Sequence, residues 1–176
     1  ISKDISVMRT DLTSGILKTI DFNINRKSTT NNFFEFGSTY HKKKGNYEQN
    51  KKLTIVMYGD LINSNWLHNK LISNFFYLKN IVKNIFEKFN LSFDEEIIDN
   101  GIVFKKSNKE IASIISLDNL LINKISISNN IFCATIDTTL LFKNINNSYF
   151  NVDKISKFPT VKRDFSFVLN NEVSYK

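Results

Sequence analysis

Apolar residues recur at every third or fourth position in two segments of the chain, which is the spacing of an amphipathic helix. The first segment follows a cluster of candidate N-cap residues, and its apolar stripe consists of Leu12, Ile16, Leu17, Ile20 and Ile24. This stripe predicts a helix of about 12 residues. The second segment follows the candidate N-caps Ser73 and Asn74 and runs to about Asn90. Its apolar residues are Phe75, Leu78, Ile81, Val82, Ile85, Phe86 and Phe89.

Alternating or continuous apolar runs predict strands elsewhere. Residues 34–39 alternate, and residues 53–59 follow them after a lysine-rich turn, so the two runs should pair as an antiparallel hairpin. Shorter runs of β character cover residues 91–98, 102–106 and 110–117. Residues 118–125 are expected to form a short helix. Residues 131–137 are apolar on both faces, which is typical of a central strand.

The order of these elements favours an α+β fold, in which an antiparallel sheet has its helices packed on one side. Strands do not alternate regularly with helices, so a doubly wound parallel sheet is not expected. We place one domain at residues 1–142, an asparagine-rich linker at 143–157 and the start of a second domain at 158–176, with a strand over 164–169. Because the chain begins at Ile1 and stops within a strand-to-loop transition, we interpret it as a piece of a longer protein.

The composition allows a substantial core, since 41% of the residues are hydrophobic and sixteen are Phe. Lys and Arg exceed Asp and Glu by 24 − 17 = 7, which fits an anionic partner such as RNA. Abundant Asn, Lys, Ile and Phe with scarce Gly and Pro offer a second explanation, namely an AT-rich coding sequence. No signal peptide or membrane span is expected. The single Cys133 forms no internal disulfide and suits a reducing cytoplasm.

The chemistry-bearing residues do not form a recognisable catalytic set. His41 and His68 have no Cys or acidic residue at ligand spacing, so a metal site is not expected. Cys133 lies in an apolar run and is interpreted as a buried, inert thiol. Residues 94–96 are acidic, and a solvated strand edge explains them better than an acid/base pair. No phosphate-binding glycine loop or nucleophile elbow occurs, and we expect no catalytic, cofactor or metal site in this chain.

Two basic clusters are candidates for contact with phosphate groups. Lysines at 42–44 and 51–52 flank the first hairpin, where a solvated hairpin tip is the simpler interpretation. Lys162 and Arg163 lie near Phe158 and Phe165 in the sequence and are the better candidates for RNA contact, although these rings also suit a sheet core. Arg9 precedes a helix and is interpreted as an ion-pair partner, with Glu35 the expected acid.

Motifs in the first half of the chain resemble the β subunit of bacterial phenylalanyl-tRNA synthetase. Residues 7–12 read Val-Met-Arg-Thr-Asp-Leu, where the family has Met-Arg-Thr-Ser-Leu. Residues 34–37 match its Phe-Glu-x-Gly, after a helix of similar position. Trp66 and the segment 74–79 are similar to its Trp followed by Val-Asp-Phe-Phe-Asp-Leu-Lys.

The resemblance continues in the second half. Residues 132–137 lie where the family has an apolar strand ending in Asp. Residues 158–164, Phe-Pro-Thr-Val-Lys-Arg-Asp, are similar to the Tyr-Pro-x-Val-x-Arg-Asp opening of the family's anticodon-binding domain. The motif residues that carry the whole resemblance are Arg9, Glu35, Gly37, Trp66, Phe75, Phe76, Lys79, Pro159 and Asp164. Each motif alone is weak, but five in the right order and spacing are specific.

The resemblance implies the fold of a class II aminoacyl-tRNA synthetase core that is catalytically silent, followed by the first strand of a ferredoxin-like anticodon-binding domain. It implies a cytoplasmic protein that packs against the catalytic α subunit in an (αβ)₂ heterotetramer. That enzyme, phenylalanine–tRNA ligase, attaches phenylalanine to tRNA(Phe) with ATP and Mg²⁺, whose sites lie outside this chain. Within the chain, the resemblance implies a structural scaffold.

The sequence departs from the family pattern in places. Asp11 and residues 13–14 stand where the family has Ser and Leu-Pro, and Asn80 replaces a Gly. Residues 111–121 lack the family's Gly-x-Leu-His-Pro-like signature. These changes concern local loop structure.

Two rival functions stay open on the residues alone. The net charge and lysine clusters fit a free-standing basic RNA-binding module without catalysis, which a steep salt dependence of RNA affinity would mark. The other rival is a small-molecule enzyme that uses Arg9 and Glu35. Turnover lost in an Arg9→Ala variant would mark that enzyme.

Overall fold

The chain divides into two units, Ile1–Asn146 and Asn147–Lys176, which are described separately. This computed structural model describes residues 7–43, 45–62, 64, 66–67, 69–117, 130–145, 161–166, 168 and 170. The described residues of the second unit belong to no helix or strand. The strand expected over 164–169 is therefore not seen in its described residues, because a strand forms only where a neighbouring strand pairs with its backbone. The domain limits inferred from the sequence stay a prediction.

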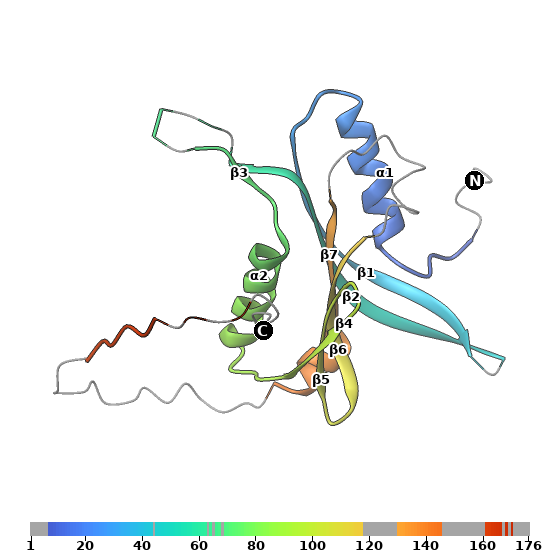
Figure 1. Cartoon of the computed structure of the whole chain (residues 1–176). Helices are drawn as coiled ribbons and strands as arrows, with labels where there is room; N and C mark the ends of the chain where they lie inside the picture. The colour runs from blue at the N-terminus through green and yellow to red at the C-terminus, as the bar shows by residue number, and fades with distance from the viewer. Residues whose placement is uncertain are drawn as a thin grey trace. The chain divides into compact units, whose positions relative to one another are not determined.

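An antiparallel sheet forms the centre of the first unit (Figure 1). Its strands are β1 (Thr30–Lys43), β2 (Asn46–Ile62), β3 (Leu71–Ile72), β4 (Asp94–Ile98), β5 (Gly101–Lys106), β6 (Lys109–Ser116) and β7 (Phe132–Asp137). The strands lie in the order β1-β2-β7-β6-β5-β4, and β3 pairs with β2. β7 pairs with β2 on one side and with β6 on the other. The predicted central position of this strand is confirmed.

The β1–β2 hairpin is longer than the rest of the sheet (Figure 1). Its two strands pair down to Lys43 and Asn46, which confirms the predicted antiparallel pair. β7, however, pairs with β2 only over residues 52–57. Residues 38–51 therefore extend past the sheet, and we call them the hairpin arm.

Both predicted amphipathic helices are present. They are α1 (Thr13–Ile24) and α2 (Phe75–Lys88). α2 begins after Asn74, whose side-chain oxygen accepts a hydrogen bond from the backbone N–H of Tyr77 at 2.8 Å. This bond satisfies one of the N–H groups that the first turn of a helix leaves without a partner.

A further short helix, α4 (Thr138–Lys143), was not expected from the sequence. It follows β7 directly, and the carboxylate of Asp137 caps it by accepting a hydrogen bond from the N–H of Leu140 at 2.9 Å. Six residues are too few to show the 3.6-residue spacing of apolar positions, so the sequence of this segment did not predict a helix. The helix expected over 118–125 lies outside the described residues. None of the described helices has the length and apolar character that a membrane crossing requires.

The two long helices cover opposite faces of the sheet (Figure 1). On β2, Val56 and Tyr58 pack in the cluster of α1, whereas Met57 packs in the cluster of α2. Successive side chains of a strand point to opposite faces, so a strand that is apolar on both faces needs a cover on each side. The expectation that the helices pack on one side is wrong for this reason.

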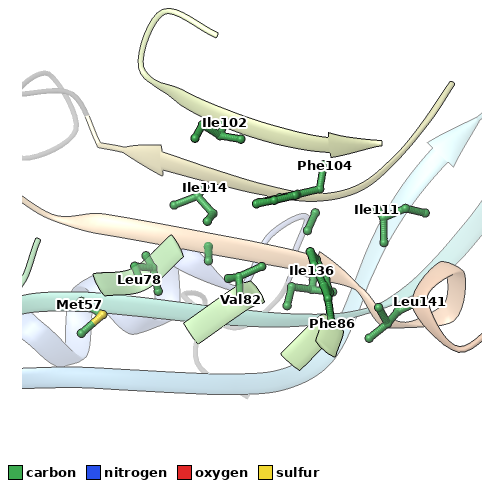
Figure 2. Packing of buried hydrophobic residues seen from close by; sticks show 12 residues of the cluster. Met57, Leu78, Val82, Phe86, Ile102, Phe104, Ile111, Ile114, Ile136 and Leu141 are labelled. Carbon is green, nitrogen blue, oxygen red and sulfur yellow. The ribbon is translucent and has the colours of Figure 1, made fainter. Parts of the chain in front are cut away.

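The larger core lies between α2 and the sheet (Figure 2). α2 contributes Leu78, Val82 and Phe86, which are almost fully buried. The ring of Phe86 meets the rings of Phe93 and Phe104 edge to face, with centroid distances of 4.5 and 5.2 Å. Such aromatic contacts add to the free energy gained by apolar burial.

A smaller core holds α1 on the other face. The buried residues Ile16, Leu17 and Ile20 pack there against Val56 and Cys133. Leu12, just before the helix, is also buried. The apolar stripe read from the sequence is therefore the face that α1 turns to the sheet.

Candidate functional site

Arg9 joins the entry segment to the edge of β1. Its guanidinium forms an ion pair with Glu35, and its Nε donates a hydrogen bond to the backbone carbonyl of Ser38 at 3.0 Å. The backbone carbonyl of Arg9 accepts a hydrogen bond from the N–H of Tyr40 at 2.9 Å. These contacts fix residues 7–12 along β1. The ion pair agrees with the interpretation of Arg9 as a structural partner of Glu35.

Gly37 makes room for this arrangement. A Cβ atom at position 37 would collide with the guanidinium of Arg9 and would lie 3.1 Å from Cδ2 of Leu12. The Phe-Glu-x-Gly motif thus has a packing explanation here, because Glu35 binds the guanidinium and Gly37 leaves space for it. Since the two charged groups bind each other, this cluster ties the entry segment to β1.

Asp11, which departs from the family pattern, supports the start of α1. Its Oδ1 accepts hydrogen bonds from the backbone N–H and the hydroxyl of Ser14, both at 2.8 Å. Leu12 occupies the N-cap position without a side-chain bond. The carboxylate therefore supplies the capping that Leu12 lacks.

Lys79, another motif residue, belongs to an ion-pair group that ties α2 to β4. Lys79 and Lys83 both contact the carboxylate of Glu95, at 2.7 and 2.6 Å. Burial alone would raise the pKa of Glu95, but hydrogen bonds from the two lysines outweigh it and hold that pKa below its ordinary value. The carboxylate is therefore kept ionised, which suits a structural link and not a general acid.

The acidic cluster on β4 has structural partners. Glu95 binds the lysines of α2, and Glu96 forms an ion pair with Lys105 of the neighbouring β5. Asp94 is exposed at the start of the strand. These contacts agree with the interpretation of the cluster as a solvated strand edge.

Cys133 is buried and lies 3.5 Å from Oγ1 of Thr13. Burial raises the pKa of the Cys133 thiol, although hydrogen bonds with Thr13 and Thr135 oppose the shift. His41 is exposed on the hairpin arm, and His68 falls outside the described residues. Among the described residues, no three His, Cys, Asp or Glu side chains lie close enough together to hold a metal ion.

An apolar groove of about 470 Å³ lies between the β1–β2 hairpin and α2. Its lining includes Phe34, Phe36, Leu53, Ile55, Ile81 and Ile85. α2 packs over β6 and β7 and does not cover the face of β1 that carries Phe34 and Phe36, so these side chains are 76% and 57% exposed. Asn32 is the one polar residue among those that line the groove. Such a surface suits an apolar partner and offers little to a charged substrate.

The remaining predicted site residues of the first unit, Trp66, Phe75 and Phe76, do not line this groove. Phe75 packs partly into the core of α2, whereas Phe76 and Trp66 are exposed. In the second unit, Lys162, Arg163 and Asp164 are exposed, and Pro159 lies outside the described residues. The proposed tRNA contact of Lys162 and Arg163 stays a prediction. The groove itself was missed, because it depends on how far α2 extends across the sheet.

Comparison with known proteins identifies the family of this chain. Residues 1–137 match the family model described as phenylalanyl tRNA synthetase beta chain CLM domain. The chain belongs to this family. The match agrees with the resemblance carried by the sequence motifs, and it covers all the described strands and both long helices.

Phenylalanine–tRNA ligase beta subunits match this chain over almost its whole length. The phenylalanine–tRNA ligase beta subunit of Bacteroides fragilis is 28% identical over 193 residues, which cover 99% of this chain and 24% of that protein. The corresponding subunit of Buchnera aphidicola from Acyrthosiphon pisum is 30% identical over 193 residues, covering 99% and 23%. The chain thus spans about a quarter of the length of these relatives. They give no support to a free-standing RNA-binding module.

Solved structures of tRNA synthetases share the fold. Two structures of pyrrolysyl-tRNA synthetase from Desulfitobacterium hafniense superpose with TM-scores of 0.56 and 0.55, each at 13% identity. The first match covers 76% of this chain and 47% of the other, and the second covers 82% and 58%. At this identity the likeness concerns the fold alone, an antiparallel sheet with flanking helices.

Proposed function

We propose that this chain is a non-catalytic scaffold of a phenylalanine–tRNA ligase. It would be the class II-like core of the β subunit, followed by the start of a ferredoxin-like anticodon-binding domain. The whole enzyme attaches phenylalanine to tRNA(Phe) in the cytoplasm with ATP and Mg²⁺, and the sites for both lie outside this chain. Family membership over residues 1–137 supports this proposal, and so does the structural use of the motif residues Arg9, Glu35 and Lys79.

The observation that carries the scaffold role is the apolar groove beside β1. Phe34 and Phe36 line this groove and are largely exposed, and the other lining residues are almost all apolar. Removing a side chain of this size from water contributes about 1.5–3 kcal/mol, and aromatic residues are frequent among those that dominate binding energy at interfaces. The α subunit covers this groove in an (αβ)₂ heterotetramer, and the groove is where the scaffold meets its catalytic partner.

The two elements on either side of the groove, β1 and α2, are each held in place by contacts within the chain. β1 is held on its outer edge by the bonds of Arg9 to Glu35 and Ser38, and on its inner edge by β2. α2, the other wall, is tied to β4 through Lys79 and Glu95. Both walls are thus fixed before the partner arrives, so little conformational freedom is lost on association.

Co-purification of the full β polypeptide with its α subunit tests this function. A Phe34→Ser variant should weaken the association by roughly tenfold or more, because a central aromatic contact is removed. Ile97→Ser is the matched control, since Ile97 is 62% exposed on β4 at the opposite edge of the sheet. The proposal fails if the unchanged protein does not associate with the α subunit, or if both variants associate equally well.

A further inference from the structure

The hairpin arm concentrates positive charge. Residues 38–51 contain four lysines and one acidic residue, a net charge of 4 − 1 = +3 out of the +7 of the whole chain. Six residues of β1 lie between Gly37 and the end of the strand, and at about 3.3 Å per residue they extend roughly 20 Å. Of the described lysines of the arm, Lys42 and Lys43 are exposed toward its tip, and Lys51 is exposed at its base, where its backbone carbonyl accepts a hydrogen bond from the hydroxyl of Thr138.

The described lysines of the arm, Lys42, Lys43 and Lys51, form no ion pair with an acidic residue among those that the structure describes. The described ion pairs use Arg9, Lys70, Lys79, Lys83 and Lys105, all outside the arm. Nζ of Lys42 instead lies 5.7 Å from the centre of the Tyr47 ring. Tyr47 is 78% exposed, so the ring and the ammonium group stand together in solvent.

One face of the arm carries these groups without any carboxylate. Tyr40 and Lys42 alternate with His41 and Lys43 along β1, so the first two share the face of Phe34 and Phe36. Their cross-strand partners on that face are Gln49 and Tyr47, and Ser38 pairs with Lys51. Glu48 pairs with His41 and therefore lies on the other face. The acid-free face continues from the rim of the groove.

The composition of the arm distinguishes between kinds of partner. Residues 38–51 include no Val, Ile, Leu, Met or Phe. The centre of a protein interface is apolar and poor in lysine, so the arm is unlike such a centre. RNA is bound by lysines at its phosphates, by amides at phosphate and sugar, and by aromatic rings that stack on unpaired bases. Lys42, Lys51, Gln49 and Tyr47 supply these three kinds of group on one face.

We propose that this face of the hairpin arm is an RNA-contact surface, in which Lys42 and Lys51 neutralise backbone phosphates and Tyr47 stacks on an unpaired base. The inference rests on the proposed function only for the identity of the RNA, the tRNA substrate of the ligase. It adds a contact to the sheet-bearing unit, separate from Lys162 and Arg163 in the second unit.

Fluorescence anisotropy of labelled tRNA with the full β polypeptide, measured across a range of KCl concentrations, tests the surface. A Lys42→Gln/Lys51→Gln variant should bind more weakly, and the slope of log K against log salt should become shallower by about 2, one for each phosphate contact. Lys18→Gln/Lys109→Gln removes two exposed lysines elsewhere and should change the slope little. Tyr47→Ala should lower the affinity roughly tenfold at every salt concentration, whereas Tyr47→Phe should retain it.

Two outcomes overturn the inference. Equal losses in both double-lysine variants would mean that tRNA responds to overall charge and not to the arm. Unchanged tRNA affinity in the arm variant, with lost binding to the α subunit, would make the arm a protein contact. Association with the α subunit is measured in parallel. If the arm variants bind tRNA as the unchanged protein does while that association is intact, only this inference is rejected. Failure of the unchanged full β polypeptide to associate with the α subunit rejects the proposed function.

Discussion

Arg9 and Gly37 depend on each other, because the guanidinium occupies the space that a side chain at position 37 would need. The sequence motif identified both residues, and the ion pair of Arg9 with Glu35 was the expected one. The bond of Arg9 to the carbonyl of Ser38 was not predictable, since no pattern of side chains reports where a backbone oxygen lies. The same holds for Lys79, whose partner Glu95 is set by the packing of α2 on β4.

Gly37→Ala should lower the free energy of unfolding by about 1 kcal/mol, because the new methyl group displaces the guanidinium and breaks an exposed ion pair. Gly15→Ala is the control. The nearest atom to a Cβ there is Oε2 of Glu35 at 3.9 Å, and Ala is favoured over Gly within a helix. Urea unfolding measures both changes, and Gly15→Ala should be neutral or stabilising.

A double variant separates the clash from other effects. In an Arg9→Ala background the guanidinium is gone, so Gly37→Ala should cost clearly less than it does in the unchanged protein. Equal costs in the two backgrounds would mean that Gly37 is required for some reason other than Arg9.

Glu95 should make the free energy of unfolding depend on pH below about pH 4.5. Its pKa is lower in the folded chain than its ordinary value of 4.5, because Lys79 and Lys83 bind the carboxylate. The stabilisation is therefore present above pH 4.5 and is lost as the pH falls below that value through the folded pKa. Denaturant unfolding across this range should show a smaller drop in Glu95→Gln than in the unchanged protein. Glu87→Gln, an exposed change on α2, should keep the full drop.

At the scale of elements, the sequence predicted what periodicity can report. α1 and α2 were found from their apolar stripes, and the central position of β7 was found from its two apolar faces. The cover on both faces of the sheet was not recognised, although the continuous apolar run over residues 55–58 indicates it. α4 was missed because one capped turn and a half carries no period.

The cap of α2 offers a test at this scale. Asn74→Ala should lower the free energy of unfolding by about 1 kcal/mol, because the N–H of Tyr77 loses its partner. Asn84→Ala, an exposed change within the same helix, should be neutral or slightly stabilising since Ala has the higher helix propensity. Thermal unfolding followed by circular dichroism compares the two variants. Equal effects would show that the residue type, and not the cap, decides the stability.

At the scale of the whole molecule, the sheet leaves one apolar region without a cover among the described residues. Sixteen Phe residues in the sequence predicted a large core, yet Phe34 and Phe36 on β1 are exposed beside the groove. A pattern of alternating apolar residues marks a face to be buried, but it does not say whether the same chain or another one buries it. The groove therefore became visible only when the reach of α2 over the sheet was known.

An exposed apolar groove should make the chain self-associate when it is alone. Phe34 and Phe36 lie on an edge strand, and edge strands with apolar side chains are common sites of association. Light scattering and sedimentation should show that Phe34→Lys/Phe36→Lys is more monomeric than the unchanged chain, because like charges on two copies repel each other. Ile97→Lys adds a charge on the far edge strand β4 and should leave self-association unchanged. If Ile97→Lys disperses the chain as well as the double variant does, net charge and not the groove governs association.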